Sequence, residues 1–431
     1  METGVRRRAI LGWCFYDWAA SAYNTVIGTF VFSVYFARGV AENEVAGTAD
    51  WARALAVSGI AVALLSPVLG AIADRGGRRK PWLALFTLLT VVFSAALWWV
   101  RPDPDYVLYA LLTVALGNVA FELANVFYNA MLPDVAPPGH VGRVSGWGWG
   151  LGYVGGLAAL VACLFGLVQA EAPLFGLLDA EEQEPVRATA LLVAAWVAVF
   201  SLPLFVLTPD RASTGVPAAR AVREGLRVLA ATLRSVRRLG NLLRYLIASA
   251  VYRDGLNTLF AFGGIFAAGT FGMSFDEIVV FAIALNVTAG LGAAGFAWID
   301  DLIGAKRTIL ISLLGLIAFG LPLLLARDVF WFWVLALGLG LFLGPAQAAG
   351  RSMMARLSPA GMEAEMFGLY ALSGRAVAFV GPLLLAWATE AFASQRAGMA
   401  TILVSFVVGF ALMLAVREEK ADMPASLRPP Q

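Results

Sequence analysis

The stretch Gly70-Ala-Ile-Ala-Asp74-Arg75-Gly-Gly77-Arg78-Arg79-Lys80-Pro81 separates two long apolar runs of this 431-residue chain. Four basic residues fall within seven positions, and the second apolar run begins at Trp82. A bilayer offers no water to an exposed backbone, so spanning segments are helices and charged turns lie outside them. Short loops rich in Lys and Arg stay on the cytoplasmic side. The stretch therefore predicts a cytoplasmic turn between two membrane spans.

The composition is that of an integral multi-pass membrane protein. Hydrophobic residues make up 60% of the chain, charged residues 14%, and the mean hydropathy is +0.78, whereas a soluble domain is nearer a quarter charged. Cys14 and Cys163 lie in apolar runs and the single histidine, His140, lies in a loop. We therefore expect no disulfide, no metal site and no cofactor. Membrane topology alone accounts for the basic loops, so no nucleic-acid partner is expected.

Spans need about twenty mostly apolar residues, and twelve segments meet this rule. They lie near 10–37, 53–73, 82–100, 106–131, 145–169, 188–207, 245–271, 277–299, 308–326, 329–350, 367–392 and 398–416. The sequence thus predicts an all-α fold of two pseudo-symmetric six-helix bundles, 1–207 and 245–416. A cytoplasmic linker, 208–244, joins them and contains an amphipathic helix over 219–239, and 417–431 forms a cytoplasmic tail.

The distribution of basic residues supports this topology. The chain has 31 Lys and Arg residues, of which 23 fall in the expected inside loops and tails and six in the outside loops. The other two, Arg253 and Arg375, lie inside expected spans. This bias places both termini in the cytoplasm. The preference for Arg over Lys, with abundant Ala and Gly, favours a bacterial cytoplasmic membrane.

A weaker copy of the basic turn occurs 227 residues later. Asp301, Gly304 and Arg307 match Asp74, Gly77 and Lys80 at that offset. Two copies half a chain apart indicate two halves of similar design. We expect these turns to form a gating loop that latches the cytoplasmic side in one state; its residues are Asp74, Arg75, Gly77, Arg78, Asp301 and Gly304.

Polar residues inside spans of the first half point to a transport pathway. A charge in a transmembrane helix costs on the order of 2.5–3.5 kcal/mol and is functional by default. Asp17, Ser21 and Asn24 share one face of the first span, and Glu122 lies at mid-depth in the fourth. A structural role in holding the bundle together is the alternative. The fourth span also contributes Asn125, Tyr128 and Asn129.

The second half contains a matching set of polar residues. Tyr252-Arg253-Asp254 precedes Asn257-Thr258 much as Tyr16-Asp17 precedes Asn24-Thr25. Gln347, Tyr370 and Arg375 lie in the tenth and eleventh spans. The expected substrate and coupling residues of this half are Arg253, Asp254, Asn257, Gln347, Tyr370 and Arg375.

These charges favour particular roles. A guanidinium binds a carboxylate through paired hydrogen bonds, so Arg253 or Arg375 would anchor an amino acid or another carboxylate. Asp17 or Glu122 would carry the coupling proton, and another coupling ion remains an alternative. In the fifth span, Gly142, Gly146 and Gly150 lie on one line and Gly148, Gly152 and Gly156 on another. Small residues at this spacing predict close helix packing.

Several motifs resemble known transporters. The pattern G-x-x-x-D-R-x-G-R-R over 70–79 resembles the loop signature of the major facilitator superfamily. The stretch Phe15-Tyr16-Asp17-Trp18-Ala-Ala-Ser21-Ala-Tyr23 is similar to the first span of its vacuole-effluxer-like family, the autophagy-related amino-acid effluxers. Further similar stretches are Asp254–Thr258, Gln347–Ser352, Glu365–Arg375 with Gly381-Pro382, and Ser394–Gly398. The resemblance implies a twelve-helix facilitator fold and solute transport, with amino-acid export in fungal members.

The predicted function is therefore secondary active transport of a small solute by alternating access, with efflux of an amino acid or other carboxylate. A sugar/cation symporter of the same superfamily is the alternative. An enzyme is not expected, because no nucleophile with a base, metal-ligand set or phosphate loop is present. A non-transporting scaffold would not retain five intramembrane charges. We expect a monomer in the lipid bilayer.

Overall fold

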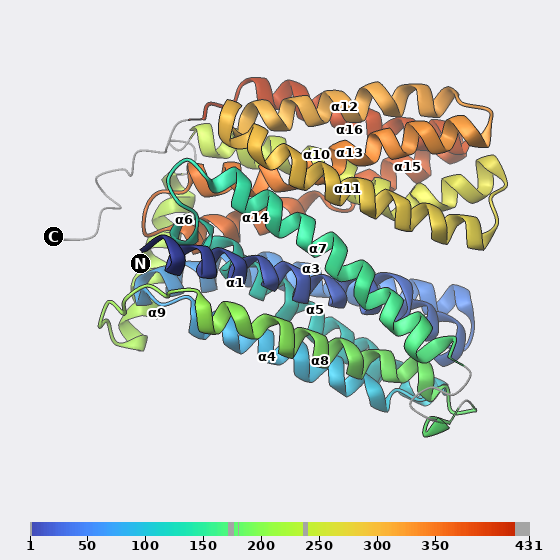
Figure 1. Ribbon diagram of the computed structural model, residues 1–431, viewed down its shortest axis with the longest axis horizontal. Coiled ribbons are helices and arrows are strands. Elements are labelled where there is room, and N and C mark those ends of the chain that lie inside the picture. The colour runs from blue at the N-terminus through green and yellow to red at the C-terminus, as the bar shows by residue number, and fades with distance from the viewer. Residues whose placement is uncertain (1, 171–175, 180, 236–239, 419–431) are drawn as a thin grey trace. The chain divides into compact units, whose positions relative to one another are not determined.

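The computed structural model describes residues 2–170, 176–179, 181–235 and 240–418, and this part of the chain contains helices and no strand. Figure 1 shows the order of the helices. The first half comprises α1 (Glu2–Ala22), η1 (Tyr23–Phe30), α2 (Phe32–Tyr35), η2 (Phe36–Val40), α3 (Glu44–Gly76), α4 (Lys80–Ala96), η3 (Leu97–Trp99), η4 (Pro104–Tyr106), α5 (Val107–Ala130), α6 (Leu132–Val135), α7 (Val141–Cys163), η5 (Leu164–Val168) and α8 (Glu184–Leu207). The remainder comprises α9 (Ala218–Ser235), α10 (Gly240–Phe271), α11 (Phe275–Ile303), α12 (Ala305–Leu325), α13 (Val329–Leu357), α14 (Glu363–Val377), α15 (Val380–Ala391) and α16 (Gln395–Leu414).

Among the described residues, ten helical segments are long and apolar enough to cross a membrane. They are Glu44–Gly76, Lys80–Trp99, Pro104–Val135, Val141–Val168, Glu184–Leu207, Glu277–Ile303, Ala305–Leu325, Val329–Leu357, Glu363–Ala391 and Gln395–Leu414. The expected spans at 10–37 and 245–271 are helical too, as α1 to η2 and as α10, but are not among the ten. That these two segments also span the membrane, which would give twelve spans in all, therefore remains a prediction.

The helix ends follow from local sequence. Ser274 and Glu277 form a capping box at the start of α11, and the Asp328 carboxylate accepts the Phe330 N–H at the start of α13. The eleventh expected span, 367–392, is instead two helices, α14 and α15. Its break lies one turn before Pro382, which lacks an N–H and whose ring clashes with the preceding turn. The tenth span is longer than expected, because α13 continues past residue 350 to Leu357.

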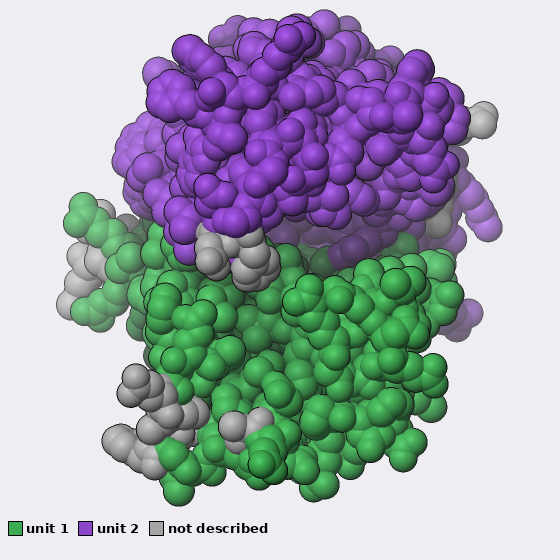
Figure 2. Space-filling view, turned by 90° about the vertical axis from the view of Figure 1, so that its right-hand side faces the viewer, with its two compact units in different colours: residues 1–65, 78–128, 151–212 green, residues 66–77, 129–150, 213–431 purple. Residues whose placement is uncertain are grey.

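The chain divides into two compact units, drawn in different colours in Figure 2. Unit 1 contains residues 1–65, 78–128 and 151–212, and unit 2 contains 66–77, 129–150 and 213–431. The end of α3 and the start of α7 are thus grouped with residues from the second half of the sequence. The proposed bundle boundaries at 207 and 245 remain predictions.

Unit 1 is packed largely through aromatic and small side chains. Trp13 and Tyr16 of α1 stack on Tyr128 of α5, with ring centroids 4.4 and 4.8 Å apart. α1 also packs on α7, where a Cβ on Gly155 would lie 2.5 Å from the Trp18 carbonyl oxygen. Lipid is as apolar as these side chains, so close packing rather than water exclusion holds such helices together.

In unit 2, the face of α7 that carries Gly142 and Gly146 packs closely on α11. A Cβ on Gly146 would lie 2.6 Å from the Ala293 carbonyl oxygen of α11, and one on Gly142 would meet the Asp300 side chain. In unit 1, a Cβ on Gly152 or Gly156 would meet Ser21 or Thr25 of α1. The close packing expected of the two glycine lines is therefore observed at these positions, because each site leaves no room for a methyl group.

The expected amphipathic helix corresponds to α9, and its predicted residues 236–239 lie outside the described part, as do residues 419–431 of the expected tail. Ala221 and Leu229 of α9 are buried, whereas Arg223 and Arg227 are exposed. Elsewhere the helices expose many large apolar side chains, such as Leu302 at 85% and Leu108 at 68%. Such surfaces are suited to lipid.

Candidate functional site

The two repeated turns have the same backbone ending. Gly77 follows α3 with φ 82° and Gly304 follows α11 with φ 93°, a region that glycine enters without the steric cost of a Cβ. An aspartate precedes each glycine: Asp74 lies in the last turn of α3, and Asp301 lies in the last turn of α11. The sequence repeat thus has a local structural counterpart.

Asp301 caps the start of α7 within unit 2. Its carboxylate oxygens accept the backbone N–H groups of Gly142 at 2.8 Å and Arg143 at 3.3 Å, and the Arg143 Nε lies 3.0 Å from Oδ2. The first N–H groups of a helix have no partner inside the helix, and the helix dipole favours an anion there. A carboxylate from α11 therefore satisfies the open end of α7.

Asp74 makes the equivalent contact with α14, also within unit 2. Its Oδ1 and Oδ2 accept the backbone N–H groups of Ala364 at 3.2 Å and Glu365 at 2.8 Å. One turn earlier, a Cβ on Gly70 would lie 2.6 Å from the Ala364 carbonyl carbon, so glycine permits this approach. Two aspartates 227 residues apart thus each cap a helix from a distant part of the chain.

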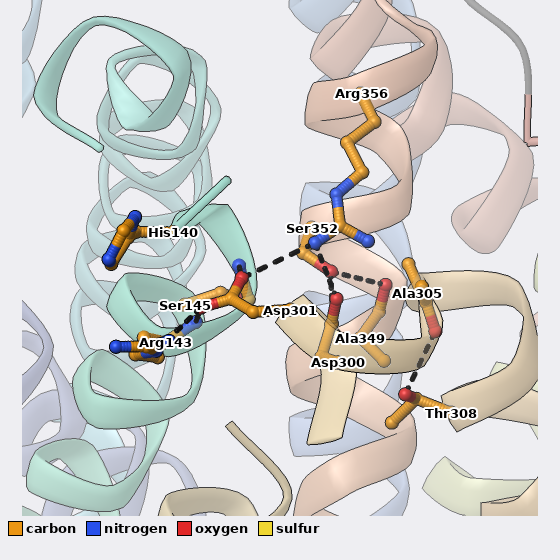
Figure 3. A network of polar contacts seen from close by, with 12 residues as sticks. His140, Arg143, Ser145, Asp300, Asp301, Ala305, Thr308, Ala349, Ser352 and Arg356 are labelled. Carbon is orange, nitrogen blue, oxygen red and sulfur yellow. Dashed lines mark hydrogen bonds and ion pairs between the residues drawn. The ribbon is translucent and has the colours of Figure 1, made fainter. Parts of the chain in front are cut away.

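Arg356 of α13 connects the acids around Asp301 (Figure 3). Its Nη2 lies 2.7 Å from Asp300 Oδ1 and 3.5 Å from Asp301 Oδ1. Its Nη1 donates to Glu418 Oε1 at 2.8 Å. The Ser352 hydroxyl donates to Asp300 Oδ2 at 2.5 Å. Asp300 and Asp301 are buried charges, and such charges need this degree of pairing to be tolerated.

Arg351, counted above with the inside loops, lies within α13 and is only 4% exposed. Its Nε donates to the Ser145 hydroxyl at 3.0 Å and its Nη2 to the Ser145 carbonyl at 2.6 Å. Its Nη1 donates to Asn129 Oδ1 at 3.3 Å, and the guanidinium lies 5.6 Å from the centre of the Trp149 ring. Arg351 therefore joins α13 to α7 and to the end of α5.

A second pair of acids caps two further helices. In unit 1, Asp210 Oδ1 accepts the N–H groups of Arg79 and Lys80 at the start of α4, at 3.0 and 3.3 Å. In unit 2, Glu418 accepts those of Ala305 and Lys306 at the start of α12, at 2.8 and 3.3 Å. These acids follow α8 and α16 respectively, so each caps a helix from its own half of the sequence.

Lys80 and Lys306 each add a further hydrogen bond beside these two caps. Lys80 Nζ donates to the Phe205 carbonyl in the last turn of α8 at 2.8 Å, and Lys306 Nζ donates to the Leu414 carbonyl in the last turn of α16 at 2.9 Å. Sequence offset matched Lys80 to Arg307, but the contacts match it to Lys306. The second turn is therefore one residue shorter between its aspartate and its lysine.

The other predicted gating residues make lesser contacts. The Arg75 carbonyl accepts the Thr214 hydroxyl at 2.7 Å, and Arg78 Nε lies 3.6 Å from Asp210 Oδ2. Arg78 is exposed, and an exposed ion pair contributes about 0–1 kcal/mol. The aspartates rather than the arginines provide the well-formed contacts.

The predicted pathway residues of unit 1 are distributed along α1, η1 and α5. Asp17 and Ser21 lie on the side of α1 that faces α7, near Gly152, and both are half-buried. Asn24 is exposed. Glu122 and Asn125 of α5 are half-buried, whereas Tyr128 is fully buried in the aromatic packing described above.

Unit 2 brings several of the other predicted residues together. The Arg253 guanidinium lies 4.0 Å from the centre of the Tyr370 ring, and its Nη1 donates to the Tyr370 carbonyl at 3.2 Å. Asp254 accepts the Gly381 N–H. Asn257 is exposed, Arg375 of α14 is half-buried, and Gln347 lies one turn before Arg351 on α13. Asn129 is held by Arg351, as described above.

The sequence predictions did not include several residues of these networks. They are Asp210, Asp300, Ser145, Arg351, Ser352, Arg356 and Glu418. Asp210 and Glu418 each follow the last span of a half within a few residues, but they lie 208 positions apart and so fall outside the repeat of 227. Nothing in the spacing of Ser145 and Arg351 indicates that they meet, because 206 positions separate them.

Comparison with solved structures defines the class of protein. The proton:xylose symporter XylE of the major facilitator superfamily matches with a TM-score of 0.72 at 14% identity, over 96% of this chain and 95% of that chain. The transporter FucP in its outward conformation matches with a TM-score of 0.70 at 14% identity, over 95% and 98%. These likenesses show the fold, which is the all-α fold of major facilitator transporters.

The family follows from a sequence model described as "Vacuole effluxer Atg22 like", which matches residues 34–141 and 140–426. The chain belongs to this family, and the resemblance read from its motifs is confirmed. The MFS-type transporter YxiO of Bacillus subtilis is 26% identical over 416 residues, 94% of each chain. Autophagy-related protein 22 of Eremothecium gossypii is 25% identical over 321 residues, covering 66% of this chain and 61% of that protein.

The capping role of Asp210 generates a prediction about stability. Replacing an acid that caps a helix costs about 0.5–2 kcal/mol, so Asp210→Ala should lower the apparent melting temperature of the purified protein. Asp210→Asn should lower it less, because the amide oxygen still accepts a hydrogen bond. The control is Glu42→Ala, at an exposed acid. Equal melting temperatures for Asp210→Ala and the control would contradict the capping role.

Proposed function

We propose that this chain is a secondary active transporter that moves a small solute by alternating access, with the Asp74 and Asp301 contacts as its gate. Both contacts consist of hydrogen bonds from the start of one helix to an aspartate of a helix distant in sequence, and contacts of this kind can break and re-form. The capping of two distant helices by the repeated aspartates is the observation that carries the proposal. The family and the fold are those of transporters, which supports it.

The proposed topology follows the charge distribution. Two six-helix bundles, 1–207 and 245–416, flank a cytoplasmic linker, with both termini in the cytoplasm of a bacterial cell. The gate then lies on the cytoplasmic side, where the basic turns are. Breaking the caps on α7 and α14 would favour the state open to that side, because the lost contacts stabilise only the closed one.

We further propose that the solute is an amino acid or another carboxylate and that it is exported. A sugar could stack on an open aromatic face, but Arg253 lies over one face of the Tyr370 ring, 4.0 Å from its centre. The Arg253 guanidinium over the ring can instead bind a carboxylate through two parallel hydrogen bonds. Arg375 supplies a second guanidinium on α14, the helix that also carries Tyr370. The description of the family as vacuole effluxers is consistent with export.

The gate can be tested by hydrogen exchange of the full-length protein. In an Asp74→Ala/Asp301→Ala double variant, the N–H groups of Ala364, Glu365, Gly142 and Arg143 lose their acceptors. A hydrogen bond to a charged group contributes about 1.5–3 kcal/mol, so exchange at both helix starts should rise by roughly tenfold or more. Mass spectrometry of peptides that cover the two starts gives the rates.

The matched control for the gate is Asp50→Ala, which removes a partly exposed acid paired with Arg53 on the same helix as Asp74. It should leave exchange at both starts unchanged. If the double variant exchanges like this control, the two aspartates do not hold the gate.

The substrate class can be tested by thermal shift with amino acids, organic acids and sugars as probes. A ligand at a hundred times its Kd stabilises a protein by about 2.7 kcal/mol, which raises the melting temperature measurably. We expect a carboxylate to stabilise the wild type and this effect to be lost in Arg375→Ala or Arg253→Ala. Arg327→Ala, at an exposed loop, is the control. Stabilisation by a sugar that survives both variants would favour a sugar/cation symporter.

A further inference from the structure

The helix break between α14 and α15 leaves backbone groups that need partners. α14 ends at Val377 and α15 begins at Val380, so the break lies one turn before Pro382, whose ring crowds the preceding turn. In a membrane, a backbone N–H freed by a broken helix must bond to protein. Gly381, next to the proline, has such an N–H, because it lies in the first turn of α15.

Asp254 of α10 provides the acceptor. Its Oδ2 accepts the Gly381 N–H at 2.7 Å, so the carboxylate caps α15 from a neighbouring helix. A Cβ on Gly381 would lie 2.9 Å from this oxygen and would also meet the Thr258 hydroxyl, so glycine is needed for the approach. The sequence motifs Asp254-Gly255 and Gly381-Pro382, more than a hundred residues apart, thus form one contact.

The second oxygen of this carboxylate has no such partner. Asp254 is only 5% exposed, and among the described residues its Oδ1 accepts no hydrogen bond. The nearby Thr258 hydroxyl donates to the backbone carbonyl of Asp254, at 2.8 Å, and not to the carboxylate. A buried ionised oxygen without a donor is costly, and a proton on Oδ1 would remove that cost.

Ionisable groups on the surrounding elements do not pair with this oxygen. Arg253, the next residue, lies over Tyr370 and donates to its carbonyl. Among the side chains that the structure describes, the remaining ionisable groups on the helices packed against α10 are Glu363, Glu365, Tyr370 and Arg375 of α14, Glu390 of α15, Arg396 of α16, Arg351 and Arg356 of α13, and Glu277, Asp300 and Asp301 of α11. On α10 itself, Tyr245 donates to the Gly350 carbonyl at 2.5 Å, and the other ionisable side chains of this helix are those of Tyr252 and Arg244.

We propose that Asp254 is the proton-binding site of this transporter and that its protonation loosens the hinge between α14 and α15. The proposal rests on the transport function proposed above. A proton from water bonds to Oδ1, and the carboxylate becomes a neutral acid. The hydrogen bond from Gly381 then loses its charge assistance, and neutral hydrogen bonds are roughly half as strong. The start of α15 is thereby freed to move.

The position of the hinge connects this site to the gate. α14 is held at its start by Asp74, through Ala364 and Glu365, and the helix that continues it is held by Asp254. The starts of both helices of this broken span, α14 and α15, thus each depend on a carboxylate of another helix within unit 2. A proton at Asp254 weakens the cap on α15, which changes the constraint on the span that Asp74 caps at its start. A metal cation would need several oxygen ligands, whereas a single free oxygen accepts a proton.

Infrared difference spectroscopy of the purified full-length protein in lipid vesicles tests the site directly. The chain has 29 Asp and Glu residues, and lowering the pH protonates other carboxylates as well. We therefore expect one component of the carboxylic-acid C=O stretching band, the Asp254 band, to appear in the wild type and to be absent from Asp254→Asn. The amide of Asp254→Asn can still accept the Gly381 N–H, so the fold should be retained. Asp17→Asn and Glu122→Gln, at the other intramembrane acids, should keep the band.

Two outcomes would overturn the proposal. One is a band that persists unchanged in a folded Asp254→Asn protein. The other is a band that is displaced by sodium at constant pH, with choline as the reference cation, which would make Asp254 a metal-cation site. Since the band does not require transport, a protein that keeps the Asp254 band but moves no solute would refute the proposed function and leave the proton site intact.

Discussion

At the starts of four helices, backbone N–H groups that have no partner within the helix donate hydrogen bonds to carboxylates of other segments. The first N–H groups of a helix cannot bond within it, and a low-dielectric surrounding makes an unpaired group expensive. Asp210, Glu418, Asp301 and Asp74 each accept two such groups, at the starts of α4, α12, α7 and α14. The charge of each acid also matches the positive end of the helix dipole. Arg356 then holds the acids Asp300, Asp301 and Glu418 close together without leaving them uncompensated.

The four caps fall into two kinds, which differ in the helices that they join. Asp210 and Glu418 cap helices of their own halves of the sequence, and lysines 80 and 306 reinforce these contacts. Asp74 and Asp301 instead join α3 to α14 and α11 to α7. We interpret the first kind as permanent supports and the second as the gate. The same chemistry thus serves both purposes, because only the choice of helices differs. Asp254 adds a fifth carboxylate at a helix start, inside the broken span rather than at its end.

The sequence predicted the class of fold because hydropathy and basic loops report directly on membrane insertion. It located Asp74 and Asp301 through the repeat, but it named Asp254 and Gly381 only in separate stretches that resemble a family and did not pair them. It did not predict the break before Pro382 or the continuation of α13 through Arg351. Both depend on partners from other helices, since Arg351 is tolerated in place by Ser145 and Asn129, and the break by Asp254. The repeat matched Lys80 to Arg307 rather than to Lys306, because the matched residues do not show that the second turn is one residue shorter. The pathway roles of Asp17, Glu122 and Arg375 remain predictions.

The proposed gate requires α7 and α11 to separate in every transport cycle, and a reversible crosslink between these two helices tests that requirement. An ideal Cβ on Gly150 lies 3.5 Å from the Cβ of Ala294, within the range of a disulfide. The native cysteines, Cys14 and Cys163, are buried, which limits competing reactions. Flux of a solute identified by thermal shift would be measured in vesicles with a Gly150→Cys/Ala294→Cys protein, and with each single variant as a control. We predict that oxidation stops flux in the double variant alone and that reduction restores it. Undiminished flux through the fully crosslinked protein would contradict the account.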